Sequence, residues 1–167
     1  NVAAFGVPDA VVIQGADEIV VLETTSGLQR VENFAETIAA LIQEHTGLLL
    51  MPATKRAKSL GARLSIQPNA AMVNDATSVT LDDGSLFAEH RMYGGLAFGK
   101  EKIKTTQAII TLAPGVLEPV EANASHTCPV VSAPYIAPHH EIMCQERRAK
   151  SVSSVDLSKA KRVVGVG

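Results

Sequence analysis

Short apolar runs alternate with amphipathic stretches along the first half of the chain. The runs at residues 1–7, 18–22 and 48–53 predict strands, and the last of them is apolar on both sides. A strand that is apolar on both sides is typical of a parallel sheet with helices on both faces. We therefore expect a parallel sheet in this half of the chain.

Two longer stretches between and after these runs predict helices. Residues 29–45 place apolar side chains on one helical face, and Gly47 follows the last turn. A second helix begins after Thr54, whose hydroxyl can cap the first turn, and Pro68 ends it. The apolar positions are Val31, Phe34, Ile38, Leu41 and Ile42 in the first helix and Ala57, Leu60 and Leu64 in the second.

Shorter signals complete the order of elements in this half. Residues 8–15 predict a brief helix from Pro8 to Gly15, and residues 70–73 predict another short strand. Strands and helices then alternate, which indicates a doubly wound α/β fold with right-handed crossovers. We expect three layers, with helices on both faces of a mostly parallel sheet.

The second half of the chain changes to antiparallel signals. Two strand-like runs within residues 77–98 flank Asp82-Asp83-Gly84, a hairpin turn signal. Residues 107–115 predict a buried strand that ends at Pro114-Gly115. Prolines recur from there to Pro138 and predict an extended arm or linker. The alternation in residues 139–149 predicts an edge strand.

Composition narrows the classes of function. Hydrophobic residues make up 46% of the chain, but aromatic residues only 4%, and Trp is absent, which argues against a base-stacking surface. The net charge of −2 gives no overall attraction to nucleic acid. Because no apolar run reaches about 18 residues, we expect no membrane insertion and a cytoplasmic protein.

Charged residues are distributed unevenly. Acids outnumber bases in residues 1–50, whereas bases are concentrated between Arg147 and Arg162. Two faces of opposite sign would help a partner to dock. The alternative is ordinary solvated surface.

The start of the second predicted helix is the candidate site. Lys55 and Arg56 lie in its first turn, where the helix dipole normally disfavours bases and free backbone amides attract anions. Thr54, Lys55 and Arg56 are therefore candidate contacts for an anion or a partner, and a solvated helix start is the alternative. The segment is not a P-loop, because its glycine, Gly61, comes too late.

Other residues with chemical potential give weaker signals. Gly94, Gly95 and Gly99 lack the dinucleotide-binding spacing and predict a bulge or a tight bend. Asn74-Asp75 is interpreted as a turn rather than a catalytic acid. We predict neither a metal site nor a nucleophile elbow, because neither spacing is present. The metal ligands considered are His126, Cys128, His139, His140 and Cys144.

Three collinear stretches resemble the α subunit of electron transfer flavoproteins, in particular the bacterial branch with the nitrogen-fixation and carnitine-associated proteins. They are MPATKRAKSLGARLSIQPNAAMVNDATSV, MYGGLAFGKEKIKTTQAIITLAPG and SVDLSKAKRVVGVG, and the resemblance covers essentially the whole chain. It implies an N-terminal α/β domain of the adenine nucleotide alpha hydrolase-like architecture over residues 1–150. Residues 151–167 would be a linker and, at Arg162–Val166, the first strand of a C-terminal FAD-binding domain.

The resemblance implies an electron carrier rather than an independent enzyme. Such a protein takes electrons from a dehydrogenase, here one acting on acyl-CoA thioesters, and passes them to a quinone oxidoreductase. It works as a heterodimer with a β subunit, which is also where AMP would belong. We expect FAD beyond Gly167, no flavin contacts within residues 1–167, and about 30 further residues before Asn1.

Two other functions stay open. An adenine-nucleotide-binding α/β module would use Thr54–Arg56 and the strand ends as its site. A structural assembly domain would expose an apolar face to a β subunit, and fold similarity alone does not decide between them. Many members of the family carry Gly where this sequence has Ala57, which favours a docking surface over a ligand at this turn.

Overall fold

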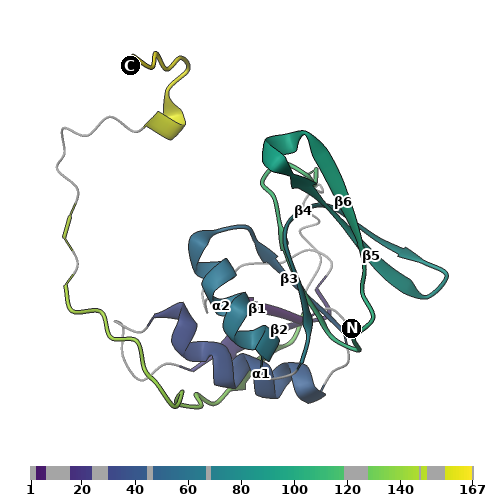
Figure 1. The fold of residues 1–167 in the computed structure, drawn as a ribbon. Coiled ribbons are helices and arrows are strands. Elements are labelled where there is room, and N and C mark those ends of the chain that lie inside the picture. The colour runs from purple at the N-terminus through teal and green to yellow at the C-terminus, as the bar shows by residue number, and fades with distance from the viewer. Residues whose placement is uncertain are drawn as a thin grey trace.

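A three-stranded parallel sheet joins the two ends of the domain. The computed structural model describes residues 3–6, 16–23, 30–44, 47–66, 69–118, 128–146, 148–149 and 157–166. In this sheet β1 (Ala3–Gly6) pairs with β2 (Glu18–Leu22), which pairs with β8 (Val130–Ala133) (Figure 1). Both pairings are parallel, so a segment from late in the sequence completes a sheet that begins at residue 3.

A five-stranded sheet holds most of the remaining strands, in the order β3-β7-β4-β5-β6. Its strands are β3 (Leu48–Pro52), β4 (Ala71–Asp82), β5 (Ser85–Met92), β6 (Ala97–Lys102) and β7 (Ala108–Leu112). β7 is parallel to both β3 and β4, whereas β4, β5 and β6 form an antiparallel meander. The expected α/β class, with a mostly parallel sheet and an antiparallel hairpin, is confirmed.

Two helices pack on one face of this sheet. The first begins as the 3-10 turn η1 (Val31–Phe34), continues as α1 (Ala35–Glu44), and lies against α2 (Lys55–Ile66). Ile38, Leu60 and Leu64 form a cluster with Ile109 of β7, and Leu22 of β2 packs against the same cluster. The described helices therefore share one apolar core with strands of both sheets.

The opposite face of β7 builds a second core. Because successive side chains of a strand point to opposite faces, Ile110 turns away from the helices. It is fully buried with Val73 and Ala76 of β4 and Ala88 of β5. The central strand β7 thus contributes to both cores of the domain.

Two burial predictions from the sequence are wrong. β3 lies at the edge of the sheet, and Leu48 and Leu50 are 38% and 48% exposed, while Leu49 and Met51 pack on the helix cluster. The strand is therefore covered on one face rather than two. Val31, which we placed on the apolar face of the first helix, is also exposed, because it lies in the 3-10 turn before α1.

Three predictions about strands and turns also need correction. Asn74-Asp75 is not a turn between elements but an irregularity inside β4, where Asp75 has a φ of 54° and the register with β7 shifts. The predicted linker contains β8, which its prolines concealed. Residues 139–146 form no strand among the described residues, because this segment is bound by Asn33 of η1 instead.

Other predictions agree with the structure or lie outside its described part. The Asp82-Asp83-Gly84 turn joins β4 to β5, and Gly94 and Gly95, both at positive φ, form the tight bend η2 (Tyr93–Gly95) before β6. The predicted helix at residues 8–15, His126 and Pro68 lie outside the described residues. A last 3-10 turn, η3, covers Leu157–Lys159. In the part of the chain that is described, no helix is long and apolar enough to cross a membrane.

The helix cluster predicts a contrast between two residues of α2. Leu64 is fully buried and Ile66 is 81% exposed. Leu64→Ala should lower the free energy of unfolding by about 2–5 kcal/mol, because it removes buried methyl groups and leaves a cavity. The matched change Ile66→Ala should stay within about 0.5 kcal/mol, and urea denaturation followed by circular dichroism measures both. Equal effects would contradict the packing described for α2.

Candidate functional site

The carboxyl ends of the parallel strands β3 and β7 meet at the start of α2. The backbone amide of Ala53 donates to the carbonyl of Leu112 at 2.9 Å and so ties the turn after β3 to the end of β7. Thr54 caps α2, because its Oγ1 accepts from the amide of Ala57 at 3.1 Å. The predicted cap is confirmed, and it places Lys55 and Arg56 in the first turn.

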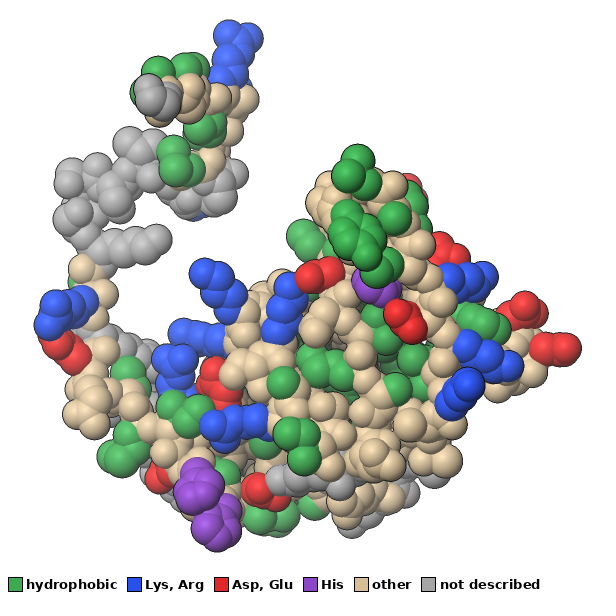
Figure 2. All heavy atoms as spheres, in the orientation of Figure 1, with side chains coloured by type: hydrophobic (Ala, Val, Ile, Leu, Met, Phe, Trp, Pro, Cys, Tyr) green, Lys and Arg blue, Asp and Glu red, His purple; other side chains and the backbone are tan. Residues whose placement is uncertain are grey.

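The exposed surface of α2 is basic. Lys55 and Arg56 are both exposed, and the first turn of α2 has no acidic residue. Lys58 instead extends its Nζ to Asp75 Oδ2 of β4 at 2.6 Å, where both side chains remain in contact with solvent. Figure 2 shows Lys and Arg side chains gathered on the side of the molecule where α2 lies. Thr54, Lys55 and Arg56, the candidate contacts from the sequence, therefore form an exposed surface rather than a closed pocket.

A hollow of about 360 Å³ lies beside this turn, at the carboxyl ends of β3 and β7. Its walls are apolar, and none of the lining residues is charged. Open α/β sheets bind ligands at this edge. An anion in the hollow would have to be held by backbone groups and by Lys55 or Arg56, which lie outside the lining of the hollow. The lining residues are Leu50, Met51, Pro52, Leu112, Ala113, Pro114, Gly115, Val116 and Leu117.

A second hollow, of about 430 Å³, opens between β4 and the β5–β6 hairpin. His90 Nε2 lies 3.3 Å from Glu101 Oε1 at its wall. A Cβ at Gly99 would come within 2.8 Å of His90 Nε2 and 2.9 Å of Met92 Sδ, so Gly99 lets these two side chains lie close to β6. This finding explains the third glycine of the motif as a packing position, and no ligand contact is needed to account for it.

The β5–β6 bend presents an exposed apolar tip, which we define as Tyr93, Leu96 and Phe98. These side chains are 77%, 91% and 66% exposed, and hydrophobic side chains gather at this end of the hairpin in Figure 2. Tyr93 has a φ of 50°, which is strained for a bulky residue. Exposed apolar groups that gather in this way mark surfaces for protein association.

A further feature was missed from the sequence, because it depends on buried polar residues. Asn33 and Thr37, on η1 and α1, are 0% and 1% exposed. They bind the main chain of Ile142 and Ile136, in the arm that follows β8. The signal was present as two polar positions four residues apart inside an apolar helical face, but the helix was assigned from its apolar positions alone.

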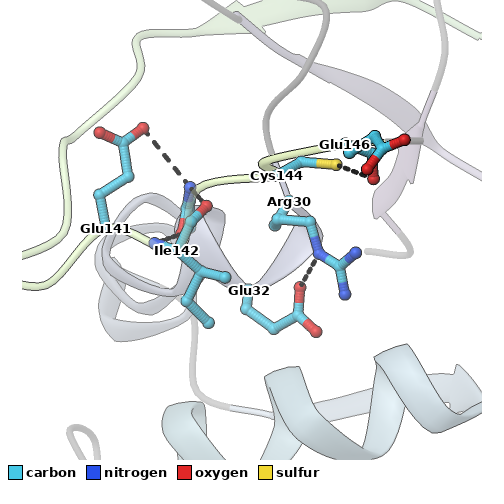
Figure 3. Close-up of polar contacts among 7 residues, drawn as sticks. Arg30, Glu32, Glu141, Ile142, Cys144 and Glu146 are labelled. Atoms are coloured by element: carbon cyan, nitrogen blue, oxygen red, sulfur yellow. Dashed lines mark hydrogen bonds and ion pairs between the residues drawn. The ribbon is translucent and has the colours of Figure 1, made fainter.

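Charged and aromatic side chains surround this contact. Arg30 Nε lies 3.6 Å from Glu32 Oε2 next to the arm, and Cys144 Sγ donates to the carbonyl of Glu146 at 3.7 Å (Figure 3). The Tyr135 ring meets Phe34 edge-on, with centroids 5.4 Å apart. Burial raises the pKa of the Tyr135 hydroxyl, and the carboxylate of Glu141 raises it further. The contact therefore joins the arm to the start of the first helix.

The described residues do not bring together the residues that were considered as metal ligands. Cys128 and Cys144 are free thiols, and the rings of His139 and His140 contact each other at a centroid distance of 4.5 Å. No three His, Cys, Asp or Glu side chains among the described residues are grouped so that they could hold a metal ion.

Comparison with known proteins gives one family. The family model of the electron transfer flavoprotein domain matches residues 2–137. YdiR of Escherichia coli K12, whose name describes a candidate electron transfer flavoprotein subunit, is 62% identical over 159 residues, which cover 95% of this chain and 51% of YdiR. FixB of Escherichia coli O127:H6 is 37% identical over 155 residues, which cover 92% of this chain and 50% of FixB.

The alignments cover most of this chain but only part of each relative. It spans about half the length of the curated relatives it matches. The family match covers most of the α/β domain described above, from before β1 to beyond β8. The chain therefore belongs to the electron transfer flavoprotein family.

Proposed function

We propose that the chain is the N-terminal α/β domain of an electron transfer flavoprotein α-type subunit. The observation that carries this proposal is the family match over residues 2–137, supported by 62% identity to YdiR. In this role the protein carries electrons from a dehydrogenase, which we take to act on acyl-CoA thioesters, to a quinone oxidoreductase and the respiratory chain. FAD supplies the redox chemistry, and the protein binds and orients it.

The flavin site is proposed to lie outside residues 1–167. Val163, Val164 and Val166 are 61%, 86% and 92% exposed, which is what a strand of a following domain would show without its sheet. Residues 1–150 would then be the α/β domain, and residues 151–167 the linker and first strand of an FAD-binding domain. We place the complex in the cytoplasm, with any AMP in the β subunit.

The chain's own contribution is proposed to be scaffold and interface. The basic first turn of α2, with Lys55 and Arg56 exposed, would contact the β subunit or a redox partner. Long-range attraction between such a basic surface and acidic groups speeds association and sets its orientation. The apolar tip of the β5–β6 hairpin is the second surface suited to protein contact.

A second candidate function is an adenine-nucleotide-binding module. The observation that favours it is the hollow at the carboxyl ends of β3 and β7, next to the capped start of α2. Calorimetric titration of the full-length protein with AMP and with ATP tests it. A tight complex that is lost on Lys55→Glu with Arg56→Glu would put this function ahead of the first.

The electron-carrier proposal predicts where flavin absorbance will be found. The visible spectrum is recorded on the longest natural chain that contains residues 1–167, purified together with its β subunit. Oxidised-flavin bands should appear in this complex and be absent from residues 1–167 alone, because the flavin contacts lie downstream. A colourless complex that cannot be reconstituted with FAD would overturn the electron-carrier role.

The interface proposal predicts a separation of assembly from flavin content. Lys55→Glu combined with Arg56→Glu should weaken association with the β subunit or redox partner at least tenfold, while the complete complex keeps its flavin. The matched control is Lys102→Glu with Lys104→Glu, which makes the same charge change at exposed positions at the end of β6 and in the loop that follows it, away from the β5–β6 bend. Loss of flavin with association unchanged would count against the interface, as would equal weakening by the control pair.

A further inference from the structure

Asn33 binds one peptide of the arm as a neighbouring strand would. Its Nδ2 donates to the carbonyl oxygen of Ile142 at 3.0 Å, and its Oδ1 accepts from the amide of Ile142 at 2.8 Å. Glu141 Oε1 accepts from the same Nδ2 at 3.5 Å (Figure 3). The side-chain amide therefore satisfies both backbone groups of one residue, and it does so without reading the side chain of that residue.

Thr37 makes a second attachment one helical turn later. Its Oγ1 accepts from the amide of Ile136 at 2.9 Å and donates to the carbonyl oxygen of Ile136 at 3.4 Å. Residues four apart lie on one face of a helix, so Asn33 and Thr37 face the arm together. Both are almost completely buried, and the hydrogen bonds to the arm satisfy their polar groups.

The arm itself buries little apolar surface at these points. Ile136 is 43% exposed and Met143 is 73% exposed, and Tyr135, Ile142 and Cys144 are only half-buried, whereas Ala133 at the end of β8 is buried. Tyr135, edge-on to Phe34, is the aromatic contact, and its hydroxyl has no hydrogen-bond partner among the described residues. Segments that are held by few apolar contacts open at low free energy, separately from the core.

From this geometry we propose that Asn33 and Thr37 form a two-point clamp on the main chain, and that residues 134–146 are a detachable strap. With the clamp closed, the strap runs along α1 before the chain leaves the domain towards residues 157–166 (Figure 1). The clamp thereby fixes the direction in which the following segment departs. With the clamp open, that segment is tethered only from the end of β8. The proposal does not depend on a flavin.

Hydrogen exchange with mass spectrometry on the full-length protein tests the clamp. Thr37→Val keeps the shape of the side chain but removes both hydrogen bonds to Ile136. Peptides from the strap should then exchange at least fivefold faster, which matches the loss of a typical net hydrogen bond. Residues 108–112 of β7 should not change. The matched control, Thr80→Val at an exposed position of β4, should leave the strap unchanged.

Two results would overturn the clamp. If exchange of the strap changes only together with exchange of β7, the strap is part of the core. If Thr37→Val leaves exchange of the strap unchanged, the Thr37 hydroxyl does not hold the strap. Asn33→Leu is the second variant and should release the strap more strongly, because it removes the paired amide. Where Asn33→Leu unfolds the whole domain, Thr37→Val decides the question alone.

The direction of the chain needs a separate readout. Spin labels on Gln43→Cys and Lys161→Cys, with Cys128 and Cys144 replaced by Ser, report the distance from α1 to the segment after the strap. Thr37→Val should broaden the distance distribution relative to the same labels without it. A distribution that stays narrow and unchanged would contradict a role of the clamp in setting the exit direction.

Discussion

The insertion of β7 between β3 and β4 is the constraint on which the rest of the domain depends. β7 pairs in parallel with both neighbours, although residues 53–107, which include α2, β4, β5 and β6, separate it from β3 along the chain. Its two faces then supply Ile109 to the helix cluster and Ile110 to the second core, with Val73, Ala76 and Ala88. Displacing this one strand would open both cores together.

The surfaces suited to contact with partners are attached to this framework at its edges. The start of α2 is held against β7 by the bond from Ala53 to Leu112, which fixes where Lys55 and Arg56 project. At the other end of β7, Gln107 Nε2 donates to the carbonyl of Ile42 at 2.9 Å and so anchors α1, to which the strap is clamped. A rigid centre with exposed groups on its periphery suits the proposed role as scaffold and interface.

Local sequence signals predicted much of this arrangement, because helices, caps and tight turns are set by neighbouring residues. The Thr54 cap and the Asp83-Gly84 turn are examples, as is the buried strand at residues 107–115. The strand β8 and the clamp could not be read in the same way. Both depend on pairing between residues about one hundred positions apart, and a proline-rich segment shows no periodicity that marks its partner. The kink at Asp75 was hidden for a related reason, since Asn-Asp favours turns and only the register with β7 keeps it within a strand.

Native-state hydrogen exchange in increasing denaturant tests the central role of β7 most directly. The quantities to compare are the opening free energies of α2, which belongs to the helix cluster, of β5, which belongs to the second core, and of β7 itself. If β7 joins the two cores into one cooperative unit, all three should converge on the same global free energy of unfolding. If β5 opens at a clearly lower free energy while α2 and β7 stay protected, the two cores are independent and the account is wrong.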